Sequence, residues 1–341
     1  MSGGVDSSVA AALLLEQGHD VVGVTMKLWG GESDSGCCSV SDVDDARRVA
    51  DQLGIDHHVF NFGADFARDV IEPYVAAHAE GRTPNPCIEC NRHLKFDRLL
   101  TRAAALGFEV VATGHHARLA PDERGRPHLA RAADAAKDQS YVLYPVAGDA
   151  LARVAFPVGG MPKDQVRAHA ARLGLRTASK PDSQDVCFIT SVEGRRGFLA
   201  GRVEYTPGTV VDTGGREVGR VDAVELVTIG QRRGLDVGGN EAPRYAVDVD
   251  VAAATVTIGD AAALRRGGVE VEQVVWAHEP VAGAVVAQSS AHGTPVAATV
   301  EPGPGRMASV HFDAPQRRVA PGQSVVLYRG DLVVGGGIAR R

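Results

Sequence analysis

Seven residues near the start of the chain, SGGVDSS from Ser2 to Ser8, combine the residue types that bind phosphate. Gly3 and Gly4 allow backbone conformations in which successive amides converge on an anion, and an apolar, helix-like run follows them. A helix N-terminus adds its dipole and its unbonded first amides. Asp6 puts a carboxylate beside the phosphates, which is repulsive unless a cation mediates, so the loop predicts Mg²⁺ bridging Asp6 and a nucleotide.

This loop is not a Walker A motif, because the pattern GxxxxGK[ST] is absent. SGGxDS instead resembles the pyrophosphate-binding loop of the ATP-pyrophosphatase superfamily. The resemblance implies cleavage of ATP between its α- and β-phosphates and transfer of AMP. The alternative interpretation is a Gly-Ser turn ahead of an ordinary helix. Members of the superfamily make amides, guanidines or thiolated bases, so the loop alone does not identify the product.

Two cysteines in distinctive segments indicate the chemistry that follows. Cys90 lies in GRTPNPCIECNRHLKF, at the start of a predicted basic helix, where the helix terminus and nearby cations favour the thiolate. Cys187 lies in SKPDSQDVCFI, a polar segment in which it follows Asp182 and Asp185. Two thiols far apart in the sequence, each in its own loop, are typical of a pair that cooperates in one site.

These motifs together resemble the bacterial tRNA-specific 2-thiouridylase family over essentially the whole chain. The matching segments are SGGVDSS, GRTPNPC..CN...KF, ATGHHA, KDQSYVLY, SQDVCFI, TIGQRRGL and PGQSVVLY.GD...GGGI. The resemblance implies a sulfurtransferase that adenylates O2 of the wobble uridine of tRNA with ATP and Mg²⁺. Cys187 then carries a persulfide from a cysteine desulfurase or relay protein, and Cys90 is the nucleophile. A transient Cys90–Cys187 disulfide, reopened by cellular reductant in the cytoplasm, is also implied.

The resemblance places the family's binding residues at numbered positions of this chain. It implies ATP contacts at Met1, Ser2, Gly3, Gly4, Val5, Asp6, Ser7, Met26 and Gly114. It implies target-base contacts at Asn85, Pro86 and Cys87, and other tRNA contacts at His115, Lys137, Asp138, Gln139 and Gln323. Without the resemblance, His115 is interpreted as a strand-end histidine with local hydrogen bonds.

The chain departs from the family pattern at three places. Some members carry an aspartate where this chain has Cys87, which leaves the proton-transfer role of that position open. An Arg-Tyr pair that contacts tRNA in the C-terminal domain falls near Ser290 and Ala291, which cannot supply those contacts. A buried strand normally delivers a phosphate loop to the sheet edge, so we expect a start site about ten residues upstream of Met1.

The cysteines also allow other chemistry. Cys87, Cys90 and Cys187 could hold an iron–sulfur cluster with one open iron that binds sulfide, or could hold zinc. An ATP-dependent carbon–nitrogen ligase of the same superfamily would not need Cys90 and Cys187. An RNA-binding protein with an inactive loop would bind tRNA without releasing AMP. Cys37 and Cys38, in a Gly/Ser-rich segment, are interpreted as structural or incidental.

Hydrophobic patterning predicts the elements that position these residues. Helices over 5–17, 39–54, 64–81 and 91–107 alternate with strands over 20–26, 57–62 and 109–114. This alternation predicts an α/β fold with a doubly wound parallel sheet, the ATP-pyrophosphatase domain, over 1–197. Short strands separated by Gly, Pro and Asp then predict a small β-rich central domain over 198–265 and a C-terminal β-barrel over 266–341.

Composition sets the remaining limits. The 341 residues are 44% hydrophobic and 23% charged, as in soluble globular proteins. No apolar run is long enough to span a membrane, and no signal peptide is visible. Five cysteines are too few and too unevenly placed for a disulfide scaffold. The net charge of −6 argues only weakly against tRNA, since a local basic face such as 82–102 is enough for binding.

Overall fold

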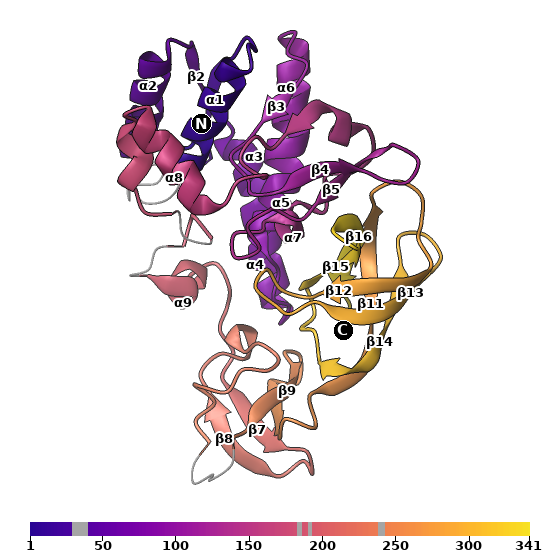
Figure 1. The fold of residues 1–341 in the computed structure, drawn as a ribbon. Helices are drawn as coiled ribbons and strands as arrows, with labels where there is room; N and C mark the ends of the chain where they lie inside the picture. The colour runs from indigo at the N-terminus through magenta and orange to yellow at the C-terminus, as the bar shows by residue number, and fades with distance from the viewer. Residues whose placement is uncertain (29–39, 183–185, 190–192, 238–242) are drawn as a thin grey trace. The chain divides into compact units, whose positions relative to one another are not determined.

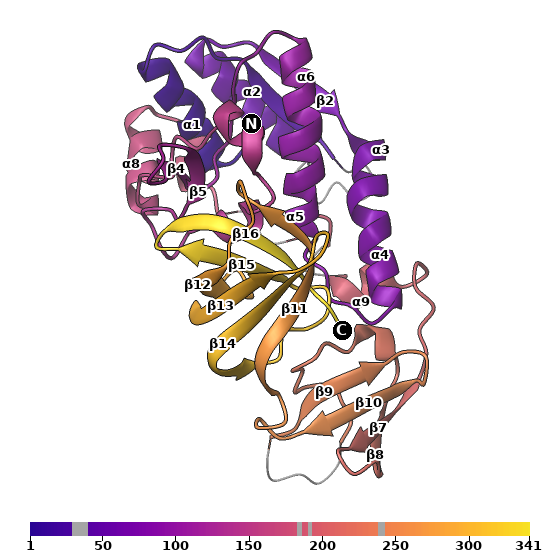
Figure 2. The same ribbon diagram turned by 90° about the vertical axis from the view of Figure 1, so that its right-hand side faces the viewer.

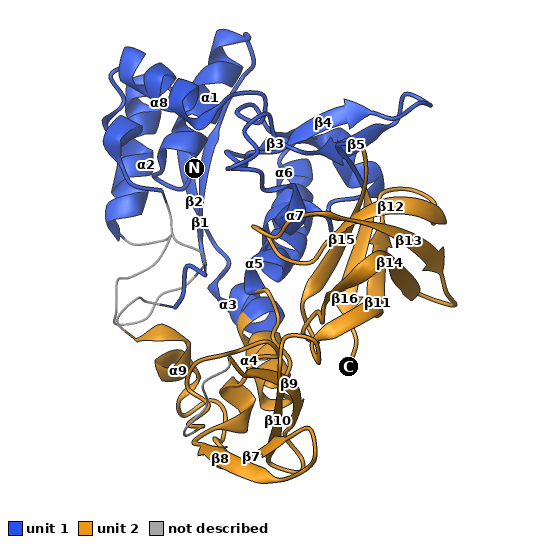
Figure 3. Ribbon diagram, turned by 60° about the horizontal axis from the view of Figure 1, so that its bottom comes forward, with its two compact units in different colours: residues 1–70, 86–192, 331–333 blue, residues 71–85, 193–330, 334–341 orange. Residues whose placement is uncertain are grey.

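The chain forms two compact units in the computed structural model, which describes residues 1–28, 40–182, 186–189, 193–237 and 243–341. Unit 1 comprises Met1–Val70, Pro86–Val192 and Asp331–Val333. Unit 2 comprises Ile71–Asn85, Glu193–Gly330 and Val334–Arg341 (Figure 3). Cys37 and Cys38 lie outside the described residues. None of the helices within the described ranges is long and apolar enough to cross a membrane.

The helix that follows the phosphate loop is α1 (Val5–Glu16). Apolar residues cover most of its surface, the pattern of a buried helix. It contacts α2 (Val40–Leu53) and α8 (Lys163–Arg172), and Val9 and Val166 are completely buried in the shared core. Burial of α1 holds the loop at its N-terminal end in a defined position (Figure 1).

Two parallel strand pairs lie in unit 1. β1 (Gly23–Lys27) pairs with β2 (His57–Asn61), and β3 (Val111–Ala112) pairs with β6 (Val154–Ala155). Parallel pairing agrees with the predicted alternation of strands and helices. Within the described residues the two pairs form separate two-stranded sheets.

The segment that carries Cys90 is one continuous helical run. α5 (Pro86–Glu89) passes into a π-helix, η2 (Cys90–Arg98), and then into α6 (Leu99–Ala105). The sequence prediction began this helix at residue 91, so it missed the first turn, where Pro86 is tolerated because a first-turn amide has no intrahelical partner. A second run of this kind comprises α3 (Gly63–Phe66), η1 (Ala67–Ile71) and α4 (Glu72–Ala79).

Short elements complete unit 1. β4 (Arg118–Pro121) and β5 (Pro127–Ala130) form an antiparallel hairpin, and Ala130 pairs with Leu332 at the start of β16. The others are α7 (Ser140–Leu143), η3 (Gly148–Arg153) and η4 (Arg176–Ser179).

Unit 2 contains the predicted β-rich central region. Its four-stranded sheet has the order β8-β7-β10-β9, with β7 and β10 parallel. Val210, Val256 and Ile258 are almost completely buried beneath it. The elements are α9 (Gly194–Leu199), β7 (Gly208–Asp212), β8 (Glu217–Val221), η5 (Val224–Leu226), β9 (Tyr245–Asp250) and β10 (Thr255–Gly259).

The C-terminal strands form a six-stranded barrel in the order β11-β14-β13-β12-β15-β16, closed by pairing of β11 with β16 (Figure 2). Alternate residues point inward, and Val300, Val310 and Val325 are buried in its interior. The strands are β11 (Arg265–Trp276), β12 (Gly283–Gln288), β13 (Val296–Pro302), β14 (Ala308–Arg317), β15 (Ser324–Arg329) and β16 (Leu332–Ala339).

Candidate active site around the phosphate loop

The phosphate loop is held by its own hydrogen bonds and leaves the start of α1 without a side-chain cap. Gly3 has a φ of 68°, and a Cβ there would lie 2.3 Å from Asp42 O, so a larger residue would displace the backbone of α2. Ser7 Oγ accepts from the Ser2 amide at 3.1 Å and donates to Gly4 O at 3.2 Å. Since Gly4 is the N-cap of α1 and has no side chain, the first-turn amides are left to bind an anion.

Gly114 and Met26 are predicted ATP positions outside the loop. Gly114 lies beside the loop, and Met26 lies on the strand that contacts Met1. Gly114 follows β3, and a Cβ there would lie only 2.5 Å from Ser7 N and 2.6 Å from Asp6 C. Thr25 Oγ1 in β1 donates to Met1 O at 2.7 Å, and Met26 is the next residue of that strand. The structure therefore brings Met1, the loop and Gly114 together, with Met26 on the strand adjacent to Met1.

Asp6 is the charged centre of the loop. Lys163 Nζ donates to both of its carboxylate oxygens at 2.7 Å, and His116 Nε2 lies 3.1 Å from Oδ1. Burial raises the pKa of Asp6, but the hydrogen bonds from His116 and Lys163 outweigh it and hold the pKa below its usual value. Lys163 is therefore a cation beside Asp6 in this structure, and the predicted Mg²⁺ stays a prediction.

A second carboxylate shares the same lysine. Lys163 Nζ lies 3.0 Å from Asp182 Oδ1, and Asp182 also accepts from Lys137 Nζ at 2.8 Å and from Arg167 Nη2 at 2.7 Å. Burial raises the pKa of Asp182, but these cations lower it to about 2. Three cations and two carboxylates thus form one connected ion network that joins the phosphate loop to the segment before Cys187.

The three described cysteines are present as thiols. Cys90 is buried and Cys187 is half-buried. The sequence analysis placed Cys90 at the start of its helix, but the structure does not. It lies one turn inside, where α5 passes into η2, because the helix begins at Pro86. The helix dipole at that position is therefore weaker than the sequence argument assumed, since it falls off within the first turn.

The predicted tRNA residues of unit 1 take part in contacts within that unit. His115 Nδ1 lies 2.8 Å from Thr113 Oγ1, and burial, followed by the charge of Lys95, holds the pKa of His115 well below its usual value. Asp138 accepts from the Ala132 amide at 3.0 Å and from Ser140 Oγ at 2.8 Å.

Gln139 and Lys137 are similarly engaged. Gln139 Oε1 accepts from the His116 amide at 2.9 Å, and Lys137 contacts Asp182 as described above. Pro86 is buried and Cys87 half-buried in the first turn of α5. Gln139 and Lys137 thus contact residues around Asp6 and Asp182, and the contacts of all four residues with tRNA stay a prediction.

The predicted tRNA residues of unit 2 are Asn85 and Gln323. Gln323 Nε2 donates to Thr83 O at 2.5 Å, so it supports the segment that leads to Asn85. Near the position of the missing Arg-Tyr pair, Gln288 Nε2 donates to Ser290 O at 3.0 Å and to Ala291 O at 3.1 Å. The backbone of this turn is therefore held from within the barrel.

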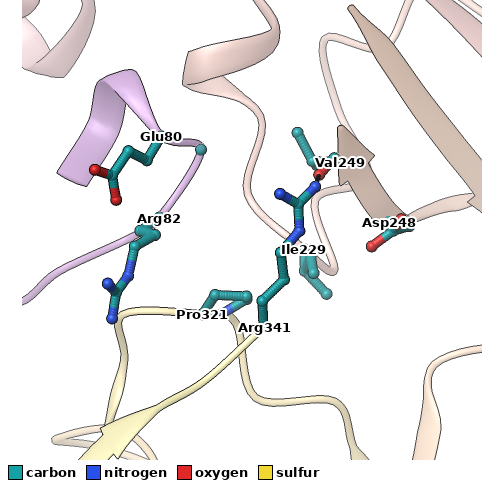
Figure 4. Close-up of a pocket in the computed structure, with 8 residues that line it drawn as sticks. Glu80, Arg82, Ile229, Asp248, Val249, Pro321 and Arg341 are labelled. Carbon is teal, nitrogen blue, oxygen red and sulfur yellow. Dashed lines mark hydrogen bonds between the residues drawn. The ribbon is translucent and has the colours of Figure 1, made fainter. Parts of the chain in front are cut away.

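A small cavity in unit 2 is lined by none of the predicted site residues (Figure 4). Arg341 Nη2 donates across it to Val249 O at 2.6 Å. Arg82, which also lines it, forms an ion pair with Glu272 at 2.6 Å. The lining residues are Glu80, Gly81, Arg82, Ile229, Asp248, Val249, Pro321 and Arg341. The cavity is therefore not the candidate active site.

The carboxylate of Asp6 and the three thiols can be compared with the metals that the sequence analysis considered. An ionised Asp6 fits a Mg²⁺–nucleotide, because Mg²⁺ takes one or two carboxylates together with substrate phosphates. Among the described residues no three His, Cys, Asp or Glu side chains are grouped to hold a metal, so the iron–sulfur and zinc alternatives gain no support from the structure. Cys87, Cys90 and Cys187 accordingly do not form a ready ligand set.

Sequence reasoning missed the parts of this site that act over long separations. Lys163 is 157 residues from Asp6, and His116 is 110 residues from it. His116 had a usable signal, since it belongs to the ATGHHA segment at the end of a predicted strand. Lys163 had none, because a lysine in an amphipathic helix is normally on a solvated face.

Family models match three successive parts of the chain. A "tRNA methyl transferase HUP domain" matches residues 1–191, a "tRNA methyl transferase PRC-barrel domain" matches 196–260, and an "Aminomethyltransferase beta-barrel domain" matches 266–339. Together with the phosphate loop, these matches define the class: a nucleotide-binding HUP domain followed by two small β domains. The predicted fold class is confirmed, while the exact domain limits stay a prediction.

Curated relatives match over the whole chain. A tRNA-specific 2-thiouridylase MnmA from Roseiflexus sp. (strain RS-1) is 47% identical over 100% of this chain and 98% of its own. A relative of the same name from Roseiflexus castenholzii is 46% identical over 100% of this chain and 98% of its own. A third, from Chloroflexus aurantiacus, is 47% identical over 100% of this chain and 97% of its own. The chain belongs to the tRNA-specific 2-thiouridylase (MnmA) family, which confirms the resemblance and the prediction of a sulfurtransferase enzyme.

One solved structure, an NMN synthetase from Francisella tularensis, matches at 19% identity with a TM-score of 0.33. It covers 53% of this chain and 63% of its own. This likeness is too weak to carry an argument.

Proposed function

We propose that the protein converts the wobble uridine of tRNA to 2-thiouridine by ATP-dependent adenylation followed by sulfur transfer. The observation that carries this proposal is the ion network that connects Asp6 of the phosphate loop, through Lys163, to Asp182 ahead of Cys187. It links a nucleotide-binding loop and a thiol-bearing segment within one unit of a chain whose relatives are named tRNA-specific 2-thiouridylases.

In the first step, O2 of the uridine attacks the α-phosphorus of ATP and pyrophosphate leaves. The amides at the start of α1, together with Gly3, Ser2 and Ser7, bind the departing phosphates. Lys163 neutralises charge that accumulates beside Asp6. Asp6 would hold a Mg²⁺ ion of the nucleotide, which would supply further charge neutralisation. The step turns the poor leaving group O2 into the leaving group AMP.

In the second step, Cys187 carries a persulfide, and Cys90 is the nucleophile. In one route the terminal persulfide sulfur attacks C2 of the uridine and expels AMP, and the Cys90 thiolate then attacks Sγ of Cys187, which breaks the S–S bond and leaves the sulfur on C2. In the other route the Cys90 thiolate attacks Sγ of Cys187 first and releases sulfide, which attacks C2 and expels AMP. Both routes end in a Cys90–Cys187 disulfide, because two thiol sulfurs lose two electrons to the transferred sulfur. A cellular dithiol or thiol must then reduce that disulfide, which agrees with action in the cytoplasm.

The proposed partners follow from this chemistry. The substrate is tRNA, with Asn85, Pro86 and Cys87 at the target base and His115, Lys137, Asp138, Gln139 and Gln323 at other contacts. The base must leave the anticodon stack to reach the loop. A cysteine desulfurase or a sulfur-relay protein delivers the sulfur to Cys187.

The test is reconstitution with unmodified tRNA, Mg²⁺–ATP, a cysteine desulfurase and cysteine under reducing conditions. We expect 2-thiouridine, AMP and pyrophosphate in equal amounts, measured by nucleoside analysis and nucleotide chromatography. Release of AMP without 2-thiouridine would point to a different acceptor, and tRNA binding without AMP would point to a non-catalytic RNA-binding protein.

Asp6→Ala should lower tRNA-dependent AMP formation at least about a hundredfold, since it removes the ligand for the cation and leaves Lys163 without its main partner. Asp164→Ala, an exposed neighbour of Lys163 outside the ion network, is the matched control and should keep full activity. Full activity of Asp6→Ala would refute the assignment of the loop.

A further inference from the structure

The motif TIGQRRGL, residues 228–235, forms a turn of unit 2 that has no role in the proposed reaction. The Gln231 side chain holds this turn from within. Its Oε1 accepts from the Thr228 amide at 3.1 Å, and its Nε2 donates to Arg233 O at 2.8 Å. The Gln231 amide also donates to Thr228 O at 2.9 Å. One residue therefore fixes the path of the backbone on both sides of the turn.

The turn is also attached to the core of the β-rich central region. The Gly230 amide donates to Ala246 O at 2.7 Å, and the Ala246 amide donates to Gln231 O at 2.9 Å, which joins the turn to β9 (Figure 2). Ala246 is completely buried, and Leu235 at the other end of the motif is buried in the same hydrophobic cluster. Gly230 has a φ of 85°, a conformation that favours glycine. The turn is therefore preorganised.

Two adjacent arginines lie between these attachments. Arg232 and Arg233 are exposed, and neither guanidinium is paired with a carboxylate among the residues that the structure describes. By contrast, Arg216 and Arg220, also exposed, lie 3.2 Å and 3.3 Å from carboxylates of β7 and β8. A guanidinium binds phosphate oxygens through two parallel hydrogen bonds, so a fixed pair of arginines suits a phosphate backbone.

The turn contacts the segment that leads to Asn85, a predicted contact of the target base. Thr83 Oγ1 donates to Thr228 Oγ1 at 3.3 Å within unit 2. Thr83 O accepts from Nε2 of Gln323, a second predicted tRNA contact, at 2.5 Å. Thr83 thus links the turn to the parts of unit 2 for which tRNA contacts are predicted.

We propose that Arg232 and Arg233 form a phosphate-binding surface for tRNA, held in position by Gln231. Contacts with phosphates position an RNA without reading its sequence, and they add affinity that falls as salt rises. Because the chain has a net charge of −6, RNA binding depends on local basic surfaces of this kind. This surface adds a contact for the substrate of the proposed function, and it rests on that function.

The test measures the Kd of an unmodified tRNA transcript by filter binding between about 0.05 M and about 0.2 M salt. For the double variant Arg232→Gln, Arg233→Gln we expect the Kd to rise at least about tenfold at about 0.1 M salt. The magnitude of the slope of log Kd against log salt should fall by about 1.4 to 1.8, the value for two lost phosphate contacts.

Two further measurements test whether the contacts are with phosphates. A second tRNA of unrelated sequence should lose affinity by the same factor, since phosphates carry no sequence information. In thiolation assays the KM for tRNA should rise while kcat stays unchanged, because a distant phosphate contact stabilises the bound substrate and the transition state equally.

Matched variants separate a specific surface from a general loss of charge. The double variant Arg216→Gln, Arg220→Gln removes the same charge from paired arginines and should keep the parent Kd and slope. Gln231→Ala keeps both arginines of the turn but loosens it, so the Kd should rise about threefold with an unchanged slope. Circular dichroism serves as the folding control.

The outcomes distinguish this surface from the proposed function. A parent protein that neither binds tRNA nor forms 2-thiouridine would overturn both. An active parent with an unchanged Kd in the Arg232/Arg233 variant, or an equal loss in the Arg216/Arg220 variant, would overturn the surface alone. Normal tRNA affinity with less persulfide loaded onto Cys187 would show that the turn binds the sulfur donor instead of RNA. The parent Kd in Gln231→Ala would overturn the role of Gln231.

Discussion

Cys90 and Cys187 are presented by two different kinds of structure within the same unit. Cys90 lies inside a continuous helix, is 8% exposed, and shares that helix with the completely buried Leu94. Cys187 is half-buried and follows a residue with positive φ, and its segment is held at Asp182 by ion pairs. The helix around Cys90 is held by packing, whereas Asp182, the last described residue before Val186 and Cys187, is held by ion pairs.

The difference matches the two roles proposed for these thiols. A nucleophile must sit within about 3 to 3.5 Å of its target in a defined direction, and a packed helix supplies that precision. A persulfide carrier must first meet a donor protein and then reach the active site, so it needs an element that can move. Ion pairs suit such an element, because they weaken or exchange partners when another charge arrives.

The largest expected effect comes from removing either thiol. Cys90→Ser and Cys187→Ser should each reduce 2-thiouridine formation at least about a thousandfold, since hydroxyls cannot carry or attack sulfane sulfur at neutral pH. The comparison is sharpened by mass spectrometry after incubation with desulfurase and cysteine. Cys90→Ser should hold one extra sulfur on Cys187, whereas Cys187→Ser should hold none on Cys90.

If Cys90 in the Cys187→Ser variant held as much persulfide as Cys187 holds in the Cys90→Ser variant, the two proposed roles would not be supported as assigned. Unchanged AMP release in both cysteine variants, with no 2-thiouridine even from the parent protein, would instead favour a carbon–nitrogen ligase. Circular dichroism of both variants serves as the folding control.

A smaller effect should separate packing from charge as the source of stability. Leu94→Ala, four residues after Cys90, should lower the free energy of unfolding by about 2–5 kcal/mol because it leaves a cavity in a fully buried site. Asp182→Asn should cost about 1 kcal/mol or less, since its side chain is 34% exposed and solvent screens its ion pairs. Denaturant titration measures both.

Leu106→Ala is the control for the first variant, because Leu106 follows the same helical run and is 57% exposed. It should change the free energy of unfolding by less than about 0.5 kcal/mol. A cost for Asp182→Asn that equals the cost for Leu94→Ala would contradict the contrast between the two segments.

The local motifs were predictable from sequence because each is read within a few residues. SGGVDSS identified the phosphate loop, and the structure explains its first glycine, because a Cβ at Gly3 would collide with the backbone of Asp42. The alternation of helices and strands predicted the fold class. The short strand β3 and the first turn of the Cys90 helix were placed less well, because two residues carry little periodicity and Pro86 reads as a helix breaker.

The ion network was not predictable, because it depends on pairs that only the fold brings together. In the sequence, Lys163, Lys137 and Asp182 are charged residues in polar segments, as is usual for residues on a solvated surface. They form a network because the fold buries Lys163 between Asp6 and Asp182, and no sequence pattern records that proximity. Charged pairs at long separation are the part of a site that sequence patterns record least.

The smallest expected effect is a response to salt that only one of the two thiols should show. Raising the ionic strength from about 0.1 M to about 1 M shortens the screening length from about 10 Å to about 3 Å, which weakens partly exposed ion pairs. The alkylation rate of Cys187 should therefore rise about twofold to threefold, while that of Cys90 stays within error, because hydrophobic packing is not screened. Asp182→Asn should remove the response at Cys187. An equal rise at both thiols would show that salt loosens the unit as a whole, and the distinction between a packed thiol and a charge-held thiol would then be wrong.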